Sequence, residues 1–190
     1  MELQEALKER RTIRRFKKNN ISDENIRKLL EAACLSVSTS NRQPWRFMLL
    51  DGEMKDGIAD IMMMLSEANN IDLPGYVCRC QLAASVVKQV PLLILVFKEP
   101  EEEYSTGDIL SIGASMGNIS LKAVELGLAS MWVSEVCYLE YEVKKYVGAE
   151  DLKLLSAIAV GYADEVPSPQ SRKDPHSFLI EPKINPSRIV

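Results

Sequence analysis

The feature that most constrains the fold is an unbroken apolar run, Leu92-Leu93-Ile94-Leu95-Val96-Phe97, which Pro91 introduces. A strand with one face in water alternates apolar and polar side chains, whereas an uninterrupted apolar run is typical of a strand covered on both faces. Such a strand needs a layer of other elements above it and another below it. The run therefore predicts a central sheet flanked by helices, a mixed α/β layer arrangement.

Stretches with helical periodicity surround this run and can supply the two layers. After Ser22, a good N-cap, the apolar residues Ile26, Leu29, Leu30 and Ala33 follow the i, i+3, i+4, i+7 spacing of a helix. The same reasoning predicts helices over about 2–11, 54–68, 79–88, 108–126 and 139–147. Short apolar runs predict further strands over about 45–50, 129–133 and 154–162.

The length of the chain favours one folding unit. With 190 residues we expect a single domain over residues 1–190, large enough to form a core without disulfide or metal staples. The last 28 residues contain five prolines and few helix signals. We therefore expect residues 161–190 to form an extended tail that lies on another surface.

Charge and cysteine content argue against several functional classes. The formal net charge is −4, so the protein as a whole has no attraction to nucleic acid or to a membrane surface. No apolar segment reaches the length of a membrane span, and the first residues lack a signal-peptide core. The cysteines follow no zinc or secreted-scaffold spacing, and a single histidine leaves a metal site few ligands. We expect a cytoplasmic protein without a metal, in which Cys34, Cys78, Cys80 and Cys137 are reduced.

One motif suggests a hydrolase. The sequence Gly113-Ala114-Ser115-Met116-Gly117 matches the G-x-S-x-G nucleophile elbow, and Asp164 or Asp174 with His176 could complete a triad. An elbow requires a strand that ends at the first glycine, whereas helical periodicity runs through this motif. We favour a helix whose small residues allow another backbone to approach closely, and a serine hydrolase is an alternative.

A basic segment near the N-terminus, KERRTIRRFKK over residues 8–18, has seven basic residues and one acidic residue. It contains a single aromatic residue within an acidic protein, which argues against a nucleic-acid arm. A solvated helix end is one interpretation and an anion site is another. If the segment is helical, Arg10 and Arg14 share a side, with the Thr12 hydroxyl between them. Two guanidinium groups and a hydroxyl suit a phosphate.

A second polar segment, STSNRQ over residues 38–43, is dense in hydrogen-bonding side chains and leads into Pro44-Trp45. Together the two segments resemble signatures of the FMN-dependent nitroreductase family. Residues 10–16, RRTIRRF, resemble the family's R-R-[ST]-x-R-x-[FY]. Residues 38–47, STSNRQPWRF, resemble its S-x-x-N-x-Q-P-W-x-F loop, and GLASMWVSEV and AIAVGYADEVPSP follow in the family's order.

The resemblance implies an α+β homodimer with FMN at the subunit interface and a tail that wraps the partner subunit. It places Arg10, Arg11 and Thr12 at the phosphate and ribityl end, and Arg14 at the polar edge of the isoalloxazine. Arg172 matches a second phosphate-binding cation. The other subunit contributes its polar segment with the residue before it, namely Val37, Ser38, Thr39, Asn41 and Gln43. The backbone of Ser134 and Glu135, directly after the strand predicted over 129–133, faces the flavin N5.

The sequence departs from the family pattern at three places. Val37 stands where the family usually has proline, and Gln170 stands where it often has lysine. Ser134-Glu135 replaces a glycine-rich turn. Two of these changes predict weaker contacts to FMN, because one phosphate partner is missing and one backbone contact is altered.

The activity implied by the resemblance is carried by the cofactor. NADH or NADPH would reduce FMN, and a small organic acceptor such as a nitroaromatic or a quinone would then be reduced in a ping-pong scheme. No catalytic side chain is required, and the chain has neither a G-x-G-x-x-G nor a P-loop motif to indicate another nucleotide site. A non-catalytic flavin-binding protein is the remaining alternative. Residues 66–82, with Cys78 and Cys80, are the expected position of a substrate lid.

Overall fold

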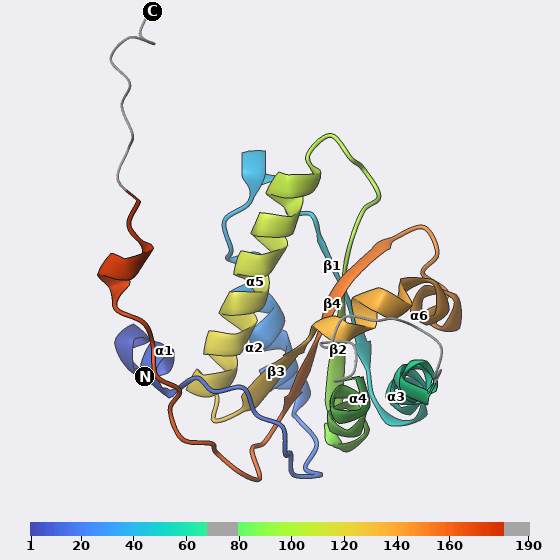
Figure 1. Cartoon of the computed structure of the whole chain (residues 1–190), viewed down its shortest axis with the longest axis horizontal. Helices are drawn as coiled ribbons and strands as arrows, with labels where there is room; N and C mark the ends of the chain where they lie inside the picture. Colours follow the sequence, from blue (N-terminus) through green and yellow to red (C-terminus); the bar gives the residue numbers. More distant parts are fainter. Residues whose placement is uncertain (68–79, 181–190) are drawn as a thin grey trace, which may run out of the picture.

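The computed structural model describes residues 1–67 and 80–180 and contains a four-stranded antiparallel sheet (Figure 1). The strands are β1 (Trp45–Leu50), β2 (Leu92–Lys98), β3 (Ala129–Val133) and β4 (Lys153–Gly161), in the order β1-β2-β4-β3. Ile94 of β2 pairs with Leu49 on one side and with Ile158 on the other. The prediction that this apolar run forms a central strand is confirmed.

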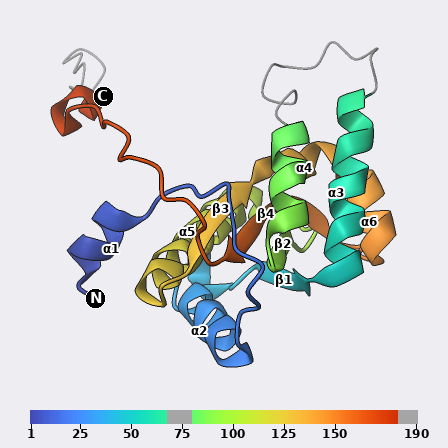
Figure 2. The ribbon, with the colours of Figure 1, turned by 90° about the horizontal axis from the view of Figure 1, so that it is seen from below.

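Helices cover both faces of the sheet (Figures 1 and 2). On one face lie α2 (Asp23–Cys34) and α5 (Ser105–Glu125); on the other lie α3 (Gly52–Glu67), α4 (Cys80–Gln89) and α6 (Glu140–Val147). Side chains of β2 alternate between the two cores. Leu93, Leu95 and Phe97 pack with α3, α4 and α6, whereas Leu92, Ile94 and Val96 pack with α2 and α5. Burial on both faces explains why the strand has no polar alternation.

Local signals account for several helix ends. The Ser22 side chain accepts a hydrogen bond from the Asn25 N–H (3.3 Å), as its N-cap prediction requires. Gly148 ends α6 with φ +68°, a left-handed conformation that favours glycine. Two further features were not predicted. Helix α5 begins at Ser105, in a polar turn without apolar periodicity, and a 3-10 helix, η3 (Ser134–Leu139), precedes α6.

The N-terminal arm, residues 10–17, differs most from its sequence prediction. Helix α1 (Leu3–Glu9) ends before the arm, which then runs in extended form past the end of the sheet. Thr12 forms a bridge with Ser130 at the start of β3, and Phe16 forms one with Ala163. Ile13 and Phe16 are buried. Because side chains alternate in an extended segment, Arg10, Thr12 and Arg14 share a side through a period of two, not through a helical turn.

The C-terminal tail is extended as far as the described residues go. Beyond Tyr162 and Ala163, residues 164–180 are exposed and contain one short 3-10 turn, η4 (Pro175–Phe178). Figure 1 shows this part of the tail leading away from the sheet. Most of the expected lid, including Cys78, lies outside the described residues, whereas Cys80 begins α4 and is buried.

Two absences hold for the part of the chain that is described. Its helices are all too short or too polar to cross a membrane. Over residues 1–67 and 80–180, no three His, Cys, Asp or Glu side chains are grouped so that they could hold a metal ion.

Candidate functional site

A cationic cavity of ≈ 510 Å³ lies between the N-terminal arm and the tail. Five basic side chains and no acidic one line it: Lys8, Arg10, Arg11, Arg14 and Arg172. Thr12 and Gln170 add polar groups to the same wall. Uncompensated positive charge in a cavity attracts anions, and guanidinium groups bind phosphate and carboxylate oxygens in forked geometry. The structure thus brings together four predicted phosphate-end residues, Arg14 and the substituted Gln170.

The cations of this cavity are not equally available. Arg11 donates hydrogen bonds to the carbonyl oxygens of Lys8 and Arg10, so its guanidinium serves groups at the end of α1 that have no partner within the helix. Among the residues described here, Lys8, Arg10, Arg14 and Arg172 form no ion pair. These four are therefore the cations that can take up an anion.

A second cavity, of ≈ 410 Å³, shares Arg10 and Thr12 with the first. Its other walls are Gly117 and Ser120 of α5 and Ser130 and Trp132 of β3.

The indole of Trp132 is held in place within this second cavity. Its Nε1–H donates to Ser120 Oγ (2.9 Å), and the Ser120 hydroxyl donates to the Met116 carbonyl (3.1 Å). Trp132 is nevertheless partly exposed. A fixed aromatic surface beside an anion site suits a ligand that carries both a planar ring and a phosphate.

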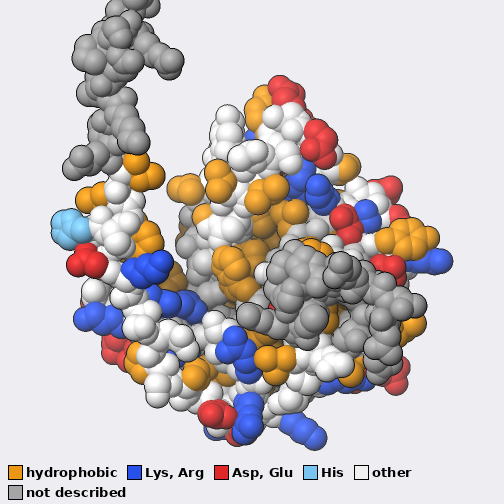
Figure 3. Space-filling model, viewed as in Figure 1, with side chains coloured by type: hydrophobic (Ala, Val, Ile, Leu, Met, Phe, Trp, Pro, Cys, Tyr) orange, Lys and Arg blue, Asp and Glu red, His pale blue; other side chains and the backbone are white. Residues whose placement is uncertain are grey.

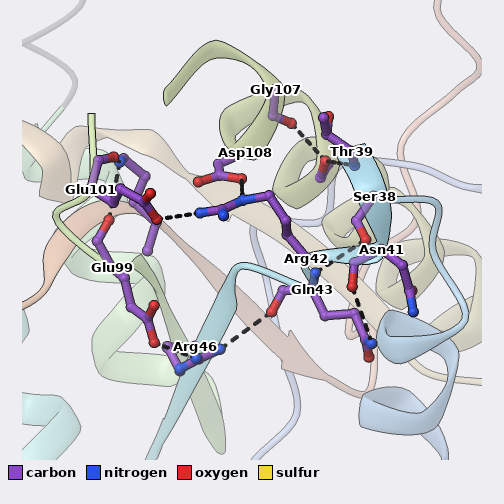
Figure 4. A network of polar contacts seen from close by, with 12 residues as sticks. Ser38, Thr39, Asn41, Arg42, Gln43, Arg46, Glu99, Glu101, Gly107 and Asp108 are labelled. Atoms are coloured by element: carbon purple, nitrogen blue, oxygen red, sulfur yellow. Dashed lines mark hydrogen bonds and ion pairs between the residues drawn. The ribbon is translucent and has the colours of Figure 1, made fainter. Parts of the chain in front are cut away.

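The polar loop Ser38–Gln43 lies near the other end of α5 (Figure 4). The Thr39 N–H donates to Ser111 Oγ (3.2 Å), and the Ser111 hydroxyl donates to the Gly107 carbonyl (2.6 Å). Along the helix, Ser111 and Ser120 are separated by about 14 Å of axial rise. Neither of the two cavities contains a residue of the loop. The two predicted halves of the site are therefore apart within one chain.

The backbone of this loop is unusual. Ser40, Asn41 and Gln43 have φ values of 50°, 54° and 49°. For residues other than glycine this left-handed conformation costs roughly 1–2 kcal/mol each, although asparagine tolerates it better. The η1 turn (Thr39–Asn41) and the hydrogen bond from the Gln43 N–H to Ser38 Oγ (3.1 Å) offset part of this cost. Strain of this kind is concentrated at binding sites and has to be supported by surrounding contacts.

Arg42 supplies such contacts, and the sequence reasoning did not single it out. Its Nε donates to Asp108 Oδ1 (3.3 Å), it forms an ion pair with Glu101, and its guanidinium carbon lies 4.2 Å from the centre of the Tyr104 ring. The hydrogen bonds to Glu101 and then to Asp108 raise the pKa of Arg42 further above its ordinary value. Arg46 forms an ion pair with Glu99. In the sequence, the acidic run over residues 99–103 was the available signal for Glu99 and Glu101.

The remaining predicted site residues line neither cavity. Val37 is exposed just before the loop. Ser134 and Glu135 form the first turn of η3, directly after β3 and two residues beyond Trp132. Their place beside the second cavity follows from chain continuity, and a contact with a ligand remains a prediction.

The nucleophile elbow is not formed. Gly113–Gly117 lies within α5, no strand ends at Gly113, and Ser115 is fully buried. His176 lies in η4 on the exposed tail. The hydrolase interpretation is wrong for this geometry, because an elbow exposes its serine at a strand-to-helix turn.

Replacing Ser115 by alanine tests whether this serine is a buried residue without a hydrogen-bonding role. Its hydroxyl is buried and has no hydrogen-bond partner among the described residues. Removing an unpaired polar group is expected to leave the free energy of unfolding unchanged or to raise it by up to about 1 kcal/mol. Urea denaturation measures the change. Ser111→Ala is the matched control and should lower stability by about 1 kcal/mol, because that hydroxyl bonds both Thr39 and Gly107. A large stability loss in Ser115→Ala would contradict this account.

Comparisons with known proteins agree with the fold. The model of the nitroreductase family matches residues 7–162. The iodotyrosine deiodinase of Thermotoga neapolitana is 30% identical over 176 residues, which cover 88% of this chain and 91% of that protein. A Desulfovibrio desulfuricans chain solved in complex with FMN has a TM-score of 0.78 and 26% identity, covering 97% of this chain and 99% of that one.

A third similarity concerns the fold alone. The FMN-dependent nitroreductase NfnB of Mycobacterium smegmatis, solved in complex with NADPH, has a TM-score of 0.75 at 19% identity and covers 95% of this chain and 97% of that chain. The family match extends from α1 through the last strand of the sheet and includes the arm, the polar loop and α5. The chain therefore belongs to the nitroreductase family.

Proposed function

We propose that this protein is an FMN-dependent oxidoreductase that takes electrons from NADH or NADPH and reduces a small organic acceptor. The observation that carries the proposal is the cationic cavity joined to the Trp132 cavity through Arg10 and Thr12. Relatives support it, since one similar chain was solved with FMN and another of the same fold with NADPH.

The residues present fit FMN in charge and in shape. Lys8, Arg10 and Arg172, which form no ion pair with the described residues, are suited to the phosphate dianion, and the Thr12 hydroxyl lies among them. Trp132 and Ser130 offer an aromatic surface and a polar edge next to that site. Bound FMN supplies the hydride and electron transfer. Arg14 places positive charge near the ring edge, where it stabilises the charge that reduction adds.

A second copy of the chain completes the site in this proposal. The loop Ser38–Gln43 is attached to the N-terminal turns of α5, whereas the cavities adjoin its C-terminal half. If two α5 helices pack antiparallel about a two-fold axis, the loop of each subunit faces the cavities of the other. One dimer would then hold two FMN sites.

Exposed apolar side chains support this dimer. Ile109 and Leu110 of α5 are exposed, and Leu35 and Val37 lie exposed beside the polar loop. Figure 3 shows hydrophobic side chains gathered over α5. Phe178, Leu179 and Ile180 are exposed on a tail that leaves the body of the chain, as expected of a segment that wraps a partner subunit. An obligate interface of about 2,000 Å² or more would cover these surfaces.

The acceptor is proposed to be a small planar compound such as a nitroaromatic or a quinone. The NfnB relative, an FMN-dependent nitroreductase by its name, supports an acceptor of this class. Among the described residues of one chain, neither cavity is lined by a histidine or a carboxylate. Donor and acceptor would occupy the same space in turn, which is a ping-pong scheme.

The visible spectrum of the purified protein tests the proposal. After incubation with FMN and removal of the excess, we expect a flavin absorption band that bleaches when NADH or NADPH is added without air. A protein that takes up no FMN would overturn the proposal. Bound FMN that neither donor bleaches would favour the non-catalytic flavin-binding protein.

A further inference from the structure

One side chain of the loop Ser38–Gln43 points away from its neighbours and toward the body of the protein. Figure 4 shows Arg42 directed toward Asp108 and Glu101, whereas the side chains of Asn41 and Gln43 are directed to the other side. Arg42 has an ordinary right-handed helical backbone, φ −67° and ψ −26°. Left-handed residues stand on both sides of it.

The partners of Arg42 form a socket that fixes the guanidinium in three ways. The Asp108 side chain is 3% exposed and accepts from Arg42 Nε, while Glu101 binds Nη2. The Tyr104 ring covers the guanidinium face at 4.2 Å. A buried carboxylate requires a charged or hydrogen-bonded partner, so the Asp108 carboxylate favours the conformation in which Arg42 reaches it. Lysine cannot reproduce a forked and stacked geometry.

Helix α5 is shaped to accept the loop at the same place. A Cβ atom added at Gly107 would stand 2.6 Å from Thr39 Oγ1, so this glycine allows the loop to lie directly against the helix. Ser111 Oγ accepts the Thr39 N–H one turn further along. The strained conformation therefore depends on contacts that α5 and the acidic loop provide.

We propose that Arg42 is the positioning residue of the cofactor loop. Through Asp108, Glu101 and Tyr104 it holds Asn41 and Gln43 in their left-handed conformations before a ligand arrives. Binding then requires less ordering of the loop, and FMN affinity rises accordingly. The identity of the ligand rests on the proposed function, whereas the ordering of the loop does not.

Hydrogen exchange in the FMN-free protein tests the ordering directly. In Arg42→Ala we expect the backbone amides of Thr39, Asn41 and Gln43 to exchange about 10-fold faster or more, because the loop opens locally at lower cost. The matched control is Arg27→Ala, which removes an arginine–carboxylate pair with Glu31 on the surface of α2. Loop exchange that is equal in Arg42→Ala and in the unmodified protein would overturn the proposal.

FMN affinity supplies the second test. Arg42→Ala should raise the FMN dissociation constant about 10-fold or more, Arg42→Lys should recover only part of the loss, and Arg27→Ala should change nothing. Asp108→Asn should act like Arg42→Ala. Arg42→Ala/Asp108→Asn, which leaves no buried unpaired charge, should be no worse than either single variant, since coupled residues are non-additive. Additive losses, or unchanged affinity in Arg42→Ala, would overturn the proposal.

The two tests separate this inference from the proposed function. If the unmodified protein binds no FMN, the proposed function fails while the exchange experiment still decides whether Arg42 orders the loop. If FMN binds and the exchange of the loop is insensitive to Arg42, the inference fails and the function stands.

Discussion

Replacing Arg10 and Arg14 together by alanine is expected to weaken FMN binding by about 100-fold to 10,000-fold. Each side chain lines the cationic cavity without an ion-pair partner among the described residues. A hydrogen bond to a charged group contributes roughly 1.5–3 kcal/mol, and about 1.4 kcal/mol corresponds to a factor of ten. Titration of the FMN-free protein, followed by flavin fluorescence, measures the change.

The control for this prediction comes from the same arm. Arg15→Ala/Lys17→Ala removes the same charge, but neither residue lines the cavity, and Arg15 pairs with Glu165 at 3.3 Å. This control should bind FMN within about 3-fold of the unmodified protein, since Arg15 is exposed and paired with Glu165, and exposed surface charges contribute little. If both double variants lose affinity equally, binding depends on net charge and not on the cavity.

Leu110→Glu is expected to convert the proposed dimer into a folded monomer that binds FMN at least about 100-fold more weakly. Leu110 is 70% exposed on α5, so the substitution costs the isolated chain little. In a two-fold interface it would bury two unpaired carboxylates, each at a cost of several kcal/mol. Light scattering after size exclusion measures the mass, and far-ultraviolet circular dichroism checks that the monomer is folded.

Leu82→Glu is the matched control for the interface. Leu82 is 49% exposed and lies on α4, on the opposite side of the sheet from α5. The mass and FMN affinity of this variant should stay unchanged. A Leu110→Glu protein that remains dimeric with full affinity would show that α5 does not form the interface. A Leu110→Glu monomer with full affinity would show that a single chain forms the site.

The layers of the fold could be predicted because they depend on local pattern. The run Leu92–Phe97 requires cover on both faces whatever its neighbours are, and β2 has that cover. The predicted start of α2 succeeded because the Ser22 side chain caps a backbone N–H group of its own helix. The start of α5 was missed because its first turn, beginning at Ser105, is polar and carries no apolar period.

The cationic cavity brings Arg10 and Arg14 together by a geometry that the sequence did not indicate. A helical turn would have placed them on one side, but α1 ends at Glu9. Pairing with β3 and burial of Ile13 keep the arm extended, and the alternation of an extended chain aligns the same side chains. Local charge density identified the residues, whereas tertiary contacts determine their conformation.

Arg42 could not be assigned a role from the sequence. Its partners Asp108 and Glu101 are 66 and 59 positions away, and nothing local distinguishes it from the other cations of the loop. The separation of the loop from the cavities could not be predicted either, because it depends on where each segment contacts α5. Contacts between segments far apart in the sequence determine both the role of Arg42 and this separation.

The separation of the loop from the cavities along α5 has a thermodynamic consequence. If each cofactor site needs both chains, cofactor uptake and self-association belong to one coupled equilibrium, and each must strengthen the other by the same factor. Occupancy would then be set by the concentration of the protein as well as by that of FMN. Dilution alone would release the cofactor, and newly made chains would acquire it only as they meet.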